Sequence, residues 1–327
     1  MLVRSSHLVR QATGLRIPSQ VRFQSINAAT SSSSNSSSTT TTSTGVQKLA
    51  VIGAGQMGAG IALVAASDAK VPVLLVDLHE AVLHKALKFL DLLLEKNVKK
   101  GKISGLDAQD IKSRITTSSS YDGLTETDFV IEAVPEIEQL KLSIFSEIST
   151  IAPANAVLST NTSSISVTRI AASAKGAEHR VVSTHFMNPV PVQKGVEIIS
   201  GLQTSSDTLQ RAIEFVRKMG KSPSVCEDAP GFMANRILLP YINEAIICLE
   251  TGIGKREDID NIMKNGCAMP MGPLALADFI GLDTCLAIMK LLHTQTGDSK
   301  YRPAILLQKM VDAGWHGKKT RKGFYDY

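Results

Sequence analysis

The stretch Val46-Gln47-Lys48-Leu49-Ala50-Val51-Ile52-Gly53-Ala54-Gly55-Gln56-Met57-Gly58 is a short apolar run that leads directly into a glycine-rich turn. An alanine-rich segment, residues 59 to about 68, follows and has the composition of a helix. A Gly-x-Gly-x-x-Gly turn between a strand and a helix binds the pyrophosphate of a dinucleotide, because its glycines admit the phosphates to the backbone and the helix N-terminus. The stretch therefore predicts a dinucleotide-binding α/β fold. Its predicted cofactor contacts are Gly53, Gly55, Gly58, Gln56 and Met57.

An acidic residue predicts which dinucleotide binds. The apolar run at residues 71–76 ends at Asp77, about 20 residues after the last glycine of the turn. A carboxylate at this distance accepts hydrogen bonds from the adenosine ribose hydroxyls and repels the 2′-phosphate of NADP. We therefore expect NAD as the cofactor.

Further apolar runs indicate a Rossmann-type, mostly parallel sheet. Predicted strands and helices alternate along the chain, with strands at residues 128–134 and 156–159 and helices at residues 81–100 and 136–151. The second of these strands ends in Thr160-Asn161-Thr162-Ser163-Ser164, and ligands bind at the carboxyl ends of parallel strands. We expect these side chains to contact the nicotinamide ribose and the substrate, with Ser163 or Ser164 capping the next helix.

A histidine and a glutamate flank a proline-rich connection. His185 follows the β-branched run at residues 181–184, and Glu197 lies within the next run, residues 196–199. Two prolines and a glycine between them indicate a loop joining two strands. If the chain turns back there, Glu197 returns beside His185, fixes its tautomer and makes it a general base. Taken alone, the pair is equally consistent with a buried histidine bound to a carbonyl.

The second half of the chain changes from mixed to helical. After a helix at residues 206–218 and a last strand at residues 224–228, the chain shows no strand pattern beyond residue 233. We place the boundary between the nucleotide domain, residues 46–230, and an all-α C-terminal domain, residues 231–327. A helical module of this size buries little surface alone, so we expect it to form a homodimer.

The N-terminal residues have the composition of a targeting segment. Arg4, Arg10, Arg16 and Arg22 all precede Asp68, the first acidic residue. Residues 1–28 therefore predict a mitochondrial transit peptide and a location in the mitochondrial matrix, and the Ser/Thr-rich residues 29–45 predict a disordered linker. The whole chain has 35 basic and 30 acidic residues, so without these four arginines 31 basic residues face 30 acidic ones. The remainder is close to neutral, which argues against a nucleic-acid partner.

Two further classes of protein are disfavoured. No apolar run is long enough to span a membrane. The four cysteines are scattered without Cys-x-x-Cys spacing, so we expect neither a disulfide framework nor a metal site.

Several motifs in order give the chain a family resemblance. Together they resemble the 3-hydroxyacyl-CoA dehydrogenases, and the C-terminal half is most similar to the short-chain branch, which acts on 3-hydroxybutyryl-CoA. The similarity covers about residues 47–327. Its motifs are Gly53–Gly58, Asn161–Ser164, His185–Pro189, Pro230–Arg236, Pro270–Pro273 and Gly323–Tyr327.

The resemblance implies roles for individual residues. His185 is implied to be the general base, with Glu197 as its orienting partner and Ser163 and Asn235 as contacts of the substrate oxygens. Asn188 is implied to line the same site next to the cofactor. The resemblance also implies cofactor contacts for Glu136, Lys141 and Lys319, and contacts with coenzyme A for Ser163, Lys141 and Lys100.

Two positions depart from the family pattern. Arg321 replaces a glycine that the family usually has, so it is strained if that position needs a positive φ. Leu93 replaces a polar neighbour of the coenzyme A contacts. These departures affect the contacts assigned to Lys319 and to the helix at residues 81–100.

The resemblance implies reversible, NAD-dependent oxidation of an L-3-hydroxyacyl-CoA, in fatty-acid β-oxidation or butanoate metabolism. One alternative is a 3-hydroxyacid dehydrogenase that acts on free acids, but such enzymes use a lysine base on the long helix, where this chain has Asn235. The other is a non-catalytic NAD-binding protein that kept the scaffold, against which the intact His185 and Glu197 argue.

Overall fold

The structure is a computed structural model that describes residues 45–327. The predicted transit peptide, residues 1–28, and all but the last residue of the predicted linker, residues 29–45, lie outside the described residues.

An eight-stranded sheet has the order β3-β2-β1-β4-β5-β6-β7-β8. Strands β1 to β6 are parallel, β7 is antiparallel to β6, and β8 is parallel to β7. The predicted mostly parallel, Rossmann-type sheet is therefore confirmed. The strands are β1 Leu49–Ile52, β2 Val73–Val76, β3 Ile115–Ser118, β4 Phe129–Glu132, β5 Val157–Thr160, β6 Val181–Phe186, β7 Gly195–Ser200 and β8 Ser222–Glu227.

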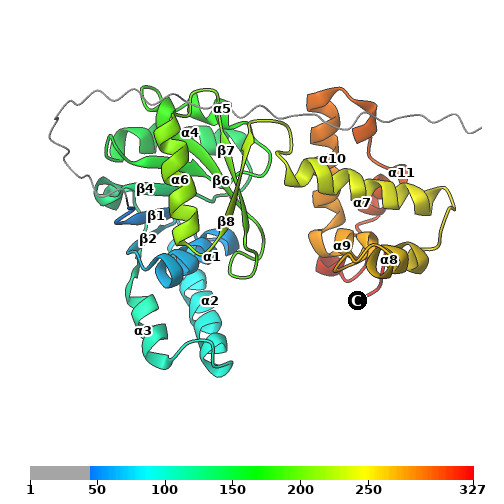
Figure 1. Cartoon of the computed structure of the whole chain (residues 1–327), viewed down its shortest axis with the longest axis horizontal. Coiled ribbons are helices and arrows are strands. Elements are labelled where there is room, and N and C mark those ends of the chain that lie inside the picture. Colours follow the sequence, from blue (N-terminus) through cyan, green and yellow to red (C-terminus); the bar gives the residue numbers. More distant parts are fainter. Residues whose placement is uncertain (1–44) are drawn as a thin grey trace, which may run out of the picture. The chain divides into compact units, whose positions relative to one another are not determined.

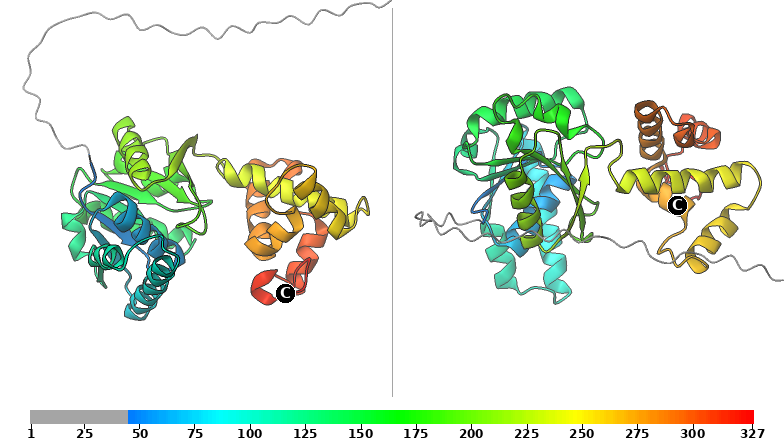
Figure 2. Two further views of the ribbon diagram at one scale, coloured as in Figure 1. Left: turned by 60° about the horizontal axis from the view of Figure 1, so that its bottom comes forward. Right: turned by 45° about the horizontal axis from the view of Figure 1, so that its top comes forward.

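Helices cover both faces of this sheet (Figure 1). Successive residues of a strand point to opposite faces, so Leu49 and Val51 belong to one apolar cluster, and Ala50 and Ile52 to the other. Strands β1, β2, β4, β5 and β6 are buried on both sides, which explains their nearly continuous apolar runs. Helices α1 (Gln56–Val64), α2 (Glu80–Lys99) and α6 (Ser206–Lys218) pack into the first cluster, and α4 (Glu138–Ile151) and α5 (Val167–Ala171) into the second. Figure 2 shows the two layers from other directions.

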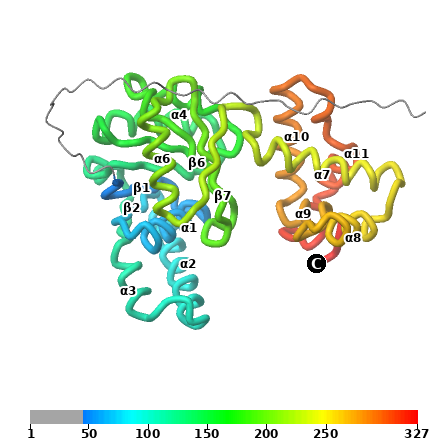
Figure 3. The backbone as a smooth tube through the Cα atoms, in the orientation of Figure 1, coloured from blue at the N-terminus to red at the C-terminus, as the bar shows by residue number. Residues whose placement is uncertain are grey.

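One helix and one strand were missed by the sequence analysis. Helix α3 (Gly105–Ser113) lies beside α2 and leads into the edge strand β3 (Figure 3). The helix begins with a capping box, because the Ser104 side chain accepts from the Asp107 N–H while the Asp107 side chain binds the Ser104 N–H. Strand β3 is half-exposed and polar, so it lacks the apolar pattern of the central strands.

The predicted cap of the helix after β5 is wrong by two or three positions. Ser166, rather than Ser163 or Ser164, is the N-cap of α5, and its hydroxyl accepts from the Arg169 N–H at 3.3 Å. The hydroxyls of Ser163 and Ser164 are free for another partner, described below.

The C-terminal part of the chain is helical, as predicted. Its helices are α7 Ala234–Glu250, α8 Arg256–Asn265, α9 Pro273–Ile280, α10 Leu282–Thr296 and α11 Ile305–Asp312. They enclose a core of their own, to which Ile242, Met289 and Leu307 contribute fully buried side chains. The buried Asp278 carboxylate accepts from the N–H groups of Phe324 and Tyr325, both at 2.9 Å, and so holds the end of the chain against this core. Within residues 45–327, no helix combines the length and apolar character needed to cross a membrane.

Candidate active site

The hairpin of β6 and β7 brings His185 and Glu197 together. The two residues are direct partners in the antiparallel register, and His185 Nδ1 lies 2.8 Å from Glu197 Oε2. The predicted return of the chain after the proline-rich connection is confirmed. Strand register places this contact, because cross-strand neighbours on one face of a sheet have adjacent side chains.

The other oxygen of Glu197 binds the start of α7. Glu197 Oε1 accepts from the N–H groups of Met233 at 2.9 Å and Ala234 at 2.8 Å. Burial raises the pKa of Glu197, but the hydrogen bonds from His185 and from these two N–H groups outweigh it and hold the pKa below its usual value. The ionised carboxylate favours a hydrogen on Nδ1 of His185, which leaves Nε2 as the proton acceptor.

The loop after β5 meets Glu136 and the first turn of α7. Glu136 Oε1 accepts from Thr162 Oγ1 at 2.6 Å, from the N–H groups of Ser163 and Ser164, and from their hydroxyls. Asn235 Nδ2 donates to the Ser163 carbonyl at 3.2 Å. The structure thus brings together three predicted site residues, Ser163, Asn235 and Glu136.

Lys141 is fully buried. Its ammonium lies 2.7 Å from Glu132 Oε1 and 3.4 Å from Glu136 Oε2. Its predicted contact with coenzyme A stays a prediction, since all its charged partners here are carboxylates of the protein. Sequence reasoning missed Glu132, although an acidic residue inside the apolar run of β4 was a signal for a buried partner.

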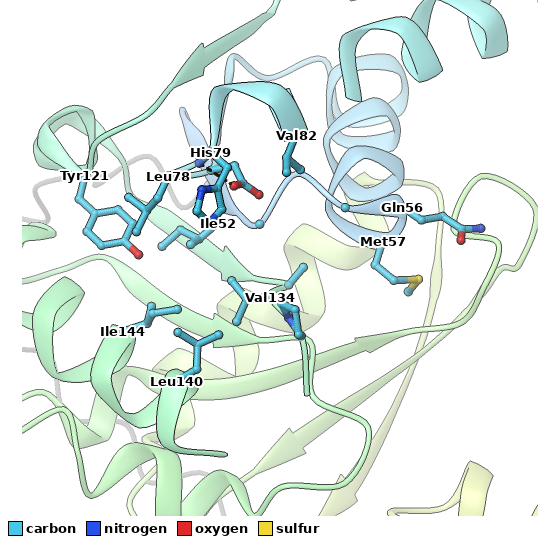
Figure 4. Close-up of a pocket in the computed structure, with 15 residues that line it drawn as sticks. Ile52, Gln56, Met57, Leu78, His79, Val82, Tyr121, Val134, Leu140 and Ile144 are labelled. Atoms are coloured by element: carbon cyan, nitrogen blue, oxygen red, sulfur yellow. Dashed lines mark hydrogen bonds between the residues drawn. The ribbon is translucent and has the colours of Figure 1, made fainter. Parts of the chain in front are cut away.

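A cavity of about 570 Å³ lies at the glycine turn and the end of β2 (Figure 4). Gly53 has a φ of +97°, and a Cβ at Gly58 would lie 1.8 Å from the Gly53 carbonyl oxygen, so both positions require glycine. A Cβ at Gly55 would meet no protein atom within 4 Å, which leaves the backbone open to a ligand.

Asp77 lies at the cavity wall, where it accepts from the Ala54 N–H at 3.0 Å. This carboxylate stands at the end of β2, where the adenosine ribose of a dinucleotide binds in such folds. Apolar side chains of Leu78, Tyr121, Leu140 and Ile144 line the adjoining space (Figure 4). Open backbone at the turn, a carboxylate and an apolar slot fit a dinucleotide.

The connection between β6 and β7 contacts the glycine turn. Gln56 Nε2 donates to Asn188 Oδ1 at 3.2 Å, which joins two predicted cofactor contacts. The Lys221 ammonium donates to the carbonyls of Val190 at 2.5 Å and Gln193 at 2.7 Å and thereby holds this connection in place. Lys221 gave no signal in the sequence, because its partners are backbone atoms.

Two predicted ligand contacts are separate from this network. Lys100 is exposed just beyond the end of α2. Lys319 forms an ion pair with Asp283 at 2.5 Å. Arg321 has a φ of +59°, which is the condition under which a residue other than glycine is strained at this position.

The described part of the chain also lacks the ligand sets that bind metal ions. Residues 45–327 hold no group of three or more His, Cys, Asp or Glu side chains suited to a metal ion.

A Rossmann-type sheet with an open glycine turn, an acid at the ribose position and an oriented histidine defines the class of NAD-dependent dehydrogenases. Family models agree and narrow the class. Residues 48–229 match the NAD-binding domain of 3-hydroxyacyl-CoA dehydrogenase, and residues 231–327 match its C-terminal domain. The chain belongs to the 3-hydroxyacyl-CoA dehydrogenase family and is an NAD-dependent enzyme of it.

Individual relatives give the same result. A probable 3-hydroxybutyryl-CoA dehydrogenase of Bacillus subtilis is 48% identical over 282 residues, covering 86% of this chain and 98% of the relative. The mitochondrial hydroxyacyl-coenzyme A dehydrogenase of Homo sapiens is 40% identical, covering 86% and 91%. The crystal structure of (S)-3-hydroxybutyryl-CoA dehydrogenase from Ralstonia eutropha has a TM-score of 0.84 at 44% identity, covering 86% and 99%.

Proposed function

We propose that this enzyme reversibly oxidises L-3-hydroxybutyryl-CoA to acetoacetyl-CoA with NAD. The 2.8 Å contact between His185 and Glu197 carries the proposal, because it provides an oriented base in a dinucleotide-binding fold. The substrate is supported by relatives named as 3-hydroxybutyryl-CoA dehydrogenases in Bacillus subtilis and Bradyrhizobium diazoefficiens, each 48% identical. β-Oxidation or butanoate metabolism is the setting that this substrate implies.

His185 serves as the acid–base group of this reaction. NAD, when bound, supplies the hydride acceptor. Nε2 of His185 takes the proton of the 3-hydroxyl, and the Glu197 carboxylate stabilises the imidazolium that forms. In reduction the imidazolium returns the proton to the 3-keto oxygen, so lower pH favours this direction.

The loop after β5 and the first turn of α7 hold the substrate oxygens. Ser163 offers its hydroxyl and Asn235 its amide, and the 3.2 Å bond between Asn235 and the Ser163 carbonyl keeps the two near each other. The bound cofactor is held by the glycine turn and Asp77, with Glu136 and Asn188 toward the nicotinamide end and Lys319 from the C-terminal part. Lys100 is the proposed contact for the phosphates of coenzyme A.

A spectrophotometric assay tests the function. NADH oxidation is followed with acetoacetyl-CoA, with free acetoacetate, and with NADPH in place of NADH. We expect rapid turnover with acetoacetyl-CoA and NADH. Activity on acetoacetate alone would identify a hydroxyacid dehydrogenase, and NADH binding without any turnover would identify a non-catalytic protein.

We further propose that the enzyme works in the mitochondrial matrix. Four arginines precede the first acidic residue, and mitochondrial relatives of Homo sapiens and Sus scrofa are 40% and 37% identical. Residues 1–44 fused to a fluorescent protein should direct it to mitochondria, and a fusion with Arg4, Arg10, Arg16 and Arg22 replaced by glutamine should not. Diffuse cytosolic fluorescence of the first fusion would contradict the proposal.

A homodimer through residues 231–327 is the proposed assembly. A cavity of about 520 Å³ between α7 and α8 is lined mainly by apolar side chains. Nearby, Ile253 is 77% exposed and Ile262 is 61% exposed, which is unusual for isoleucine. A second copy would bury these side chains. Sedimentation equilibrium should give the mass of two subunits, and the mass of one would contradict the dimer.

We also propose that residues 46–230 and 231–327 are separate domains. The segment between β8 and α7 contains Gly231 at a φ of +73° and Phe232 at a φ of +50°. Limited proteolysis should cut in this segment and yield two stable fragments. Cleavage spread evenly over the chain would contradict the division.

A further inference from the structure

A carboxylate without an assigned role lies beneath the loop after β5. Glu132, the last residue of β4, is fully buried. Its Oε1 accepts from Lys141 Nζ and from the Val134 N–H, both at 2.7 Å, and its Oε2 accepts from Thr160 Oγ1 at 2.7 Å. Every oxygen of this carboxylate therefore has a partner, and its position is fixed by β4, β5 and α4.

Lys141 is shared unequally by two carboxylates. Its ammonium is 2.7 Å from Glu132 but 3.4 Å from Glu136, and it is fully buried. Two carboxylates and one ammonium carry a net charge of −1. Because the shorter pair is the one with Glu132, the uncompensated charge belongs to Glu136.

Glu136 uses this charge to hold the loop that precedes α5. Burial raises its pKa, but Lys141 and the hydrogen bonds from Thr162, Ser164 and Ser163 outweigh burial and keep the pKa below the usual value. One oxygen accepts all the donors of the loop, and the other faces Lys141. Any change that drew Glu136 toward Lys141 would take it away from the loop.

We propose that Glu132 is a positioning residue, which takes up the charge of Lys141 so that Glu136 remains bound to the Thr162–Ser164 loop. Lys141 then acts on the loop through Glu136. The inference rests on the proposed function, in which Glu136 lies at the nicotinamide ribose and Ser163 at the substrate. It adds Glu132 as a determinant of that site.

Glu132→Gln tests the inference, because the amide keeps the shape of the side chain and removes its charge. The buried ammonium then has Glu136 as its one carboxylate and draws it out of the loop. We expect the KM for NADH to rise at least fivefold and kcat to fall about tenfold, with a smaller rise in the KM for acetoacetyl-CoA because Ser163 lies in the same loop. A purely structural role predicts less folded enzyme and a lower apparent kcat with both KM values unchanged, and that result would overturn the inference.

The double variant Glu132→Gln/Lys141→Met supplies a second test. Without the ammonium nothing pulls Glu136 from the loop, and removing both partners avoids an unpaired buried charge. We expect its KM for NADH to return to within threefold of the wild-type value, with the thermal midpoint above that of Glu132→Gln. A KM that stays as high as in the single variant would overturn the inference, since Lys141 would then contact the cofactor directly.

Glu126→Gln is the matched control. Glu126 pairs with Lys48 at 2.5 Å on the surface, so this change removes a glutamate–lysine pair without touching the site. Its KM and kcat should equal those of the wild type. The wild-type assay separates the two claims: an inactive wild type contradicts the proposed function, whereas an active wild type with an unaltered Glu132→Gln variant contradicts the role of Glu132.

Discussion

The sheet part and the helical part of this enzyme place their functional residues by different means. In the sheet part, His185 and Glu197 are direct partners in one strand pair, so their contact follows from register. In the helical part, Lys319 lies in a short turn near the C-terminus, and its ammonium is held by Asp283. A contact between cross-strand neighbours is set by the backbone pairing of the two strands. A contact made at a turn depends instead on a single side-chain partner.

The largest effect is expected at His185. The variant His185→Gln keeps a polar side chain but lacks a group that can take up the 3-hydroxyl proton. We expect kcat to fall by about 10³- to 10⁴-fold, at the upper end of what general-base catalysis contributes. NADH affinity, measured by the fluorescence of bound NADH, should change less than threefold. A variant that kept a tenth of the wild-type kcat would show that strand register alone does not identify the base.

Glu197→Gln should have a smaller effect on turnover. The amide can still bind the N-terminus of α7, but it cannot stabilise the imidazolium or enforce the tautomer of His185. We expect kcat to fall by about 10²-fold. The free energy of unfolding should fall by about 1 kcal/mol, because a carboxylate is lost at a helix N-terminus. Equal kcat values for Glu197→Gln and wild type would contradict the role of the pair.

The pH dependence of stability sharpens this prediction. The pKa of Glu197 is lower in the folded protein than its usual value of 4.5, so its stabilising contribution is present above that value and is lost as the pH falls through the folded pKa. The difference in unfolding free energy between wild type and Glu197→Gln should therefore be largest near pH 7 and shrink below about pH 4.5. Urea unfolding of both proteins from pH 3 to pH 7 measures it. A constant difference would show that the charge of Glu197 is not involved.

Asp77 tests the other end of the sheet part. Asp77→Ala removes the carboxylate proposed to bind the adenosine ribose, and such charged hydrogen bonds are worth about 1.5–3 kcal/mol. We expect the preference for NADH over NADPH, as a ratio of kcat/KM values, to fall by about 10- to 100-fold. Asp91→Ala, which removes an exposed ion pair with Lys112, is the matched control and should leave the ratio unchanged. An unchanged ratio in Asp77→Ala would contradict cofactor selection at this position.

Periodic patterns predicted much of the fold and of the site. The buried strands showed continuous apolar runs, and the return of Glu197 to His185 followed from two strands joined by a proline-rich loop. Strand β3 was missed because a half-exposed edge strand has no such pattern. The start of α3 does carry a sequence signal, because Ser104 and Asp107 have the spacing of a capping box. Patterns of this kind identify single helices and strands. They do not predict a side-chain contact that depends on how a helix packs against the sheet.

The network around Glu136 shows that limit. An acid inside the apolar run of β4 indicated a buried partner, but the partner, Lys141, depends on how α4 packs against the sheet. The same applies to Ser163 and Ser164, whose hydroxyls bind Glu136 instead of capping α5. A serine hydroxyl can bind a nearby backbone group or a distant side chain, so spacing along the sequence does not decide which partner it takes.

The smallest effect is expected in the helical part, at Arg321. A non-glycine residue in the left-handed region costs about 1–2 kcal/mol, and glycine loses about 0.5–1 kcal/mol of that advantage through the entropy of the unfolded chain. Arg321→Gly should therefore stabilise the protein by about 0.5–1 kcal/mol, measured by urea unfolding. Lys70→Gly is the matched control in the sheet part, because Lys70 has a φ of +55° and Arg321 one of +59°. Both variants should gain stability, and the KM for NADH should stay within twofold of wild type in both, since Asp283 rather than residue 321 holds Lys319. A larger change of KM in Arg321→Gly alone would show that the conformation of this turn, and not its ion pair, sets the contact of Lys319 with the cofactor.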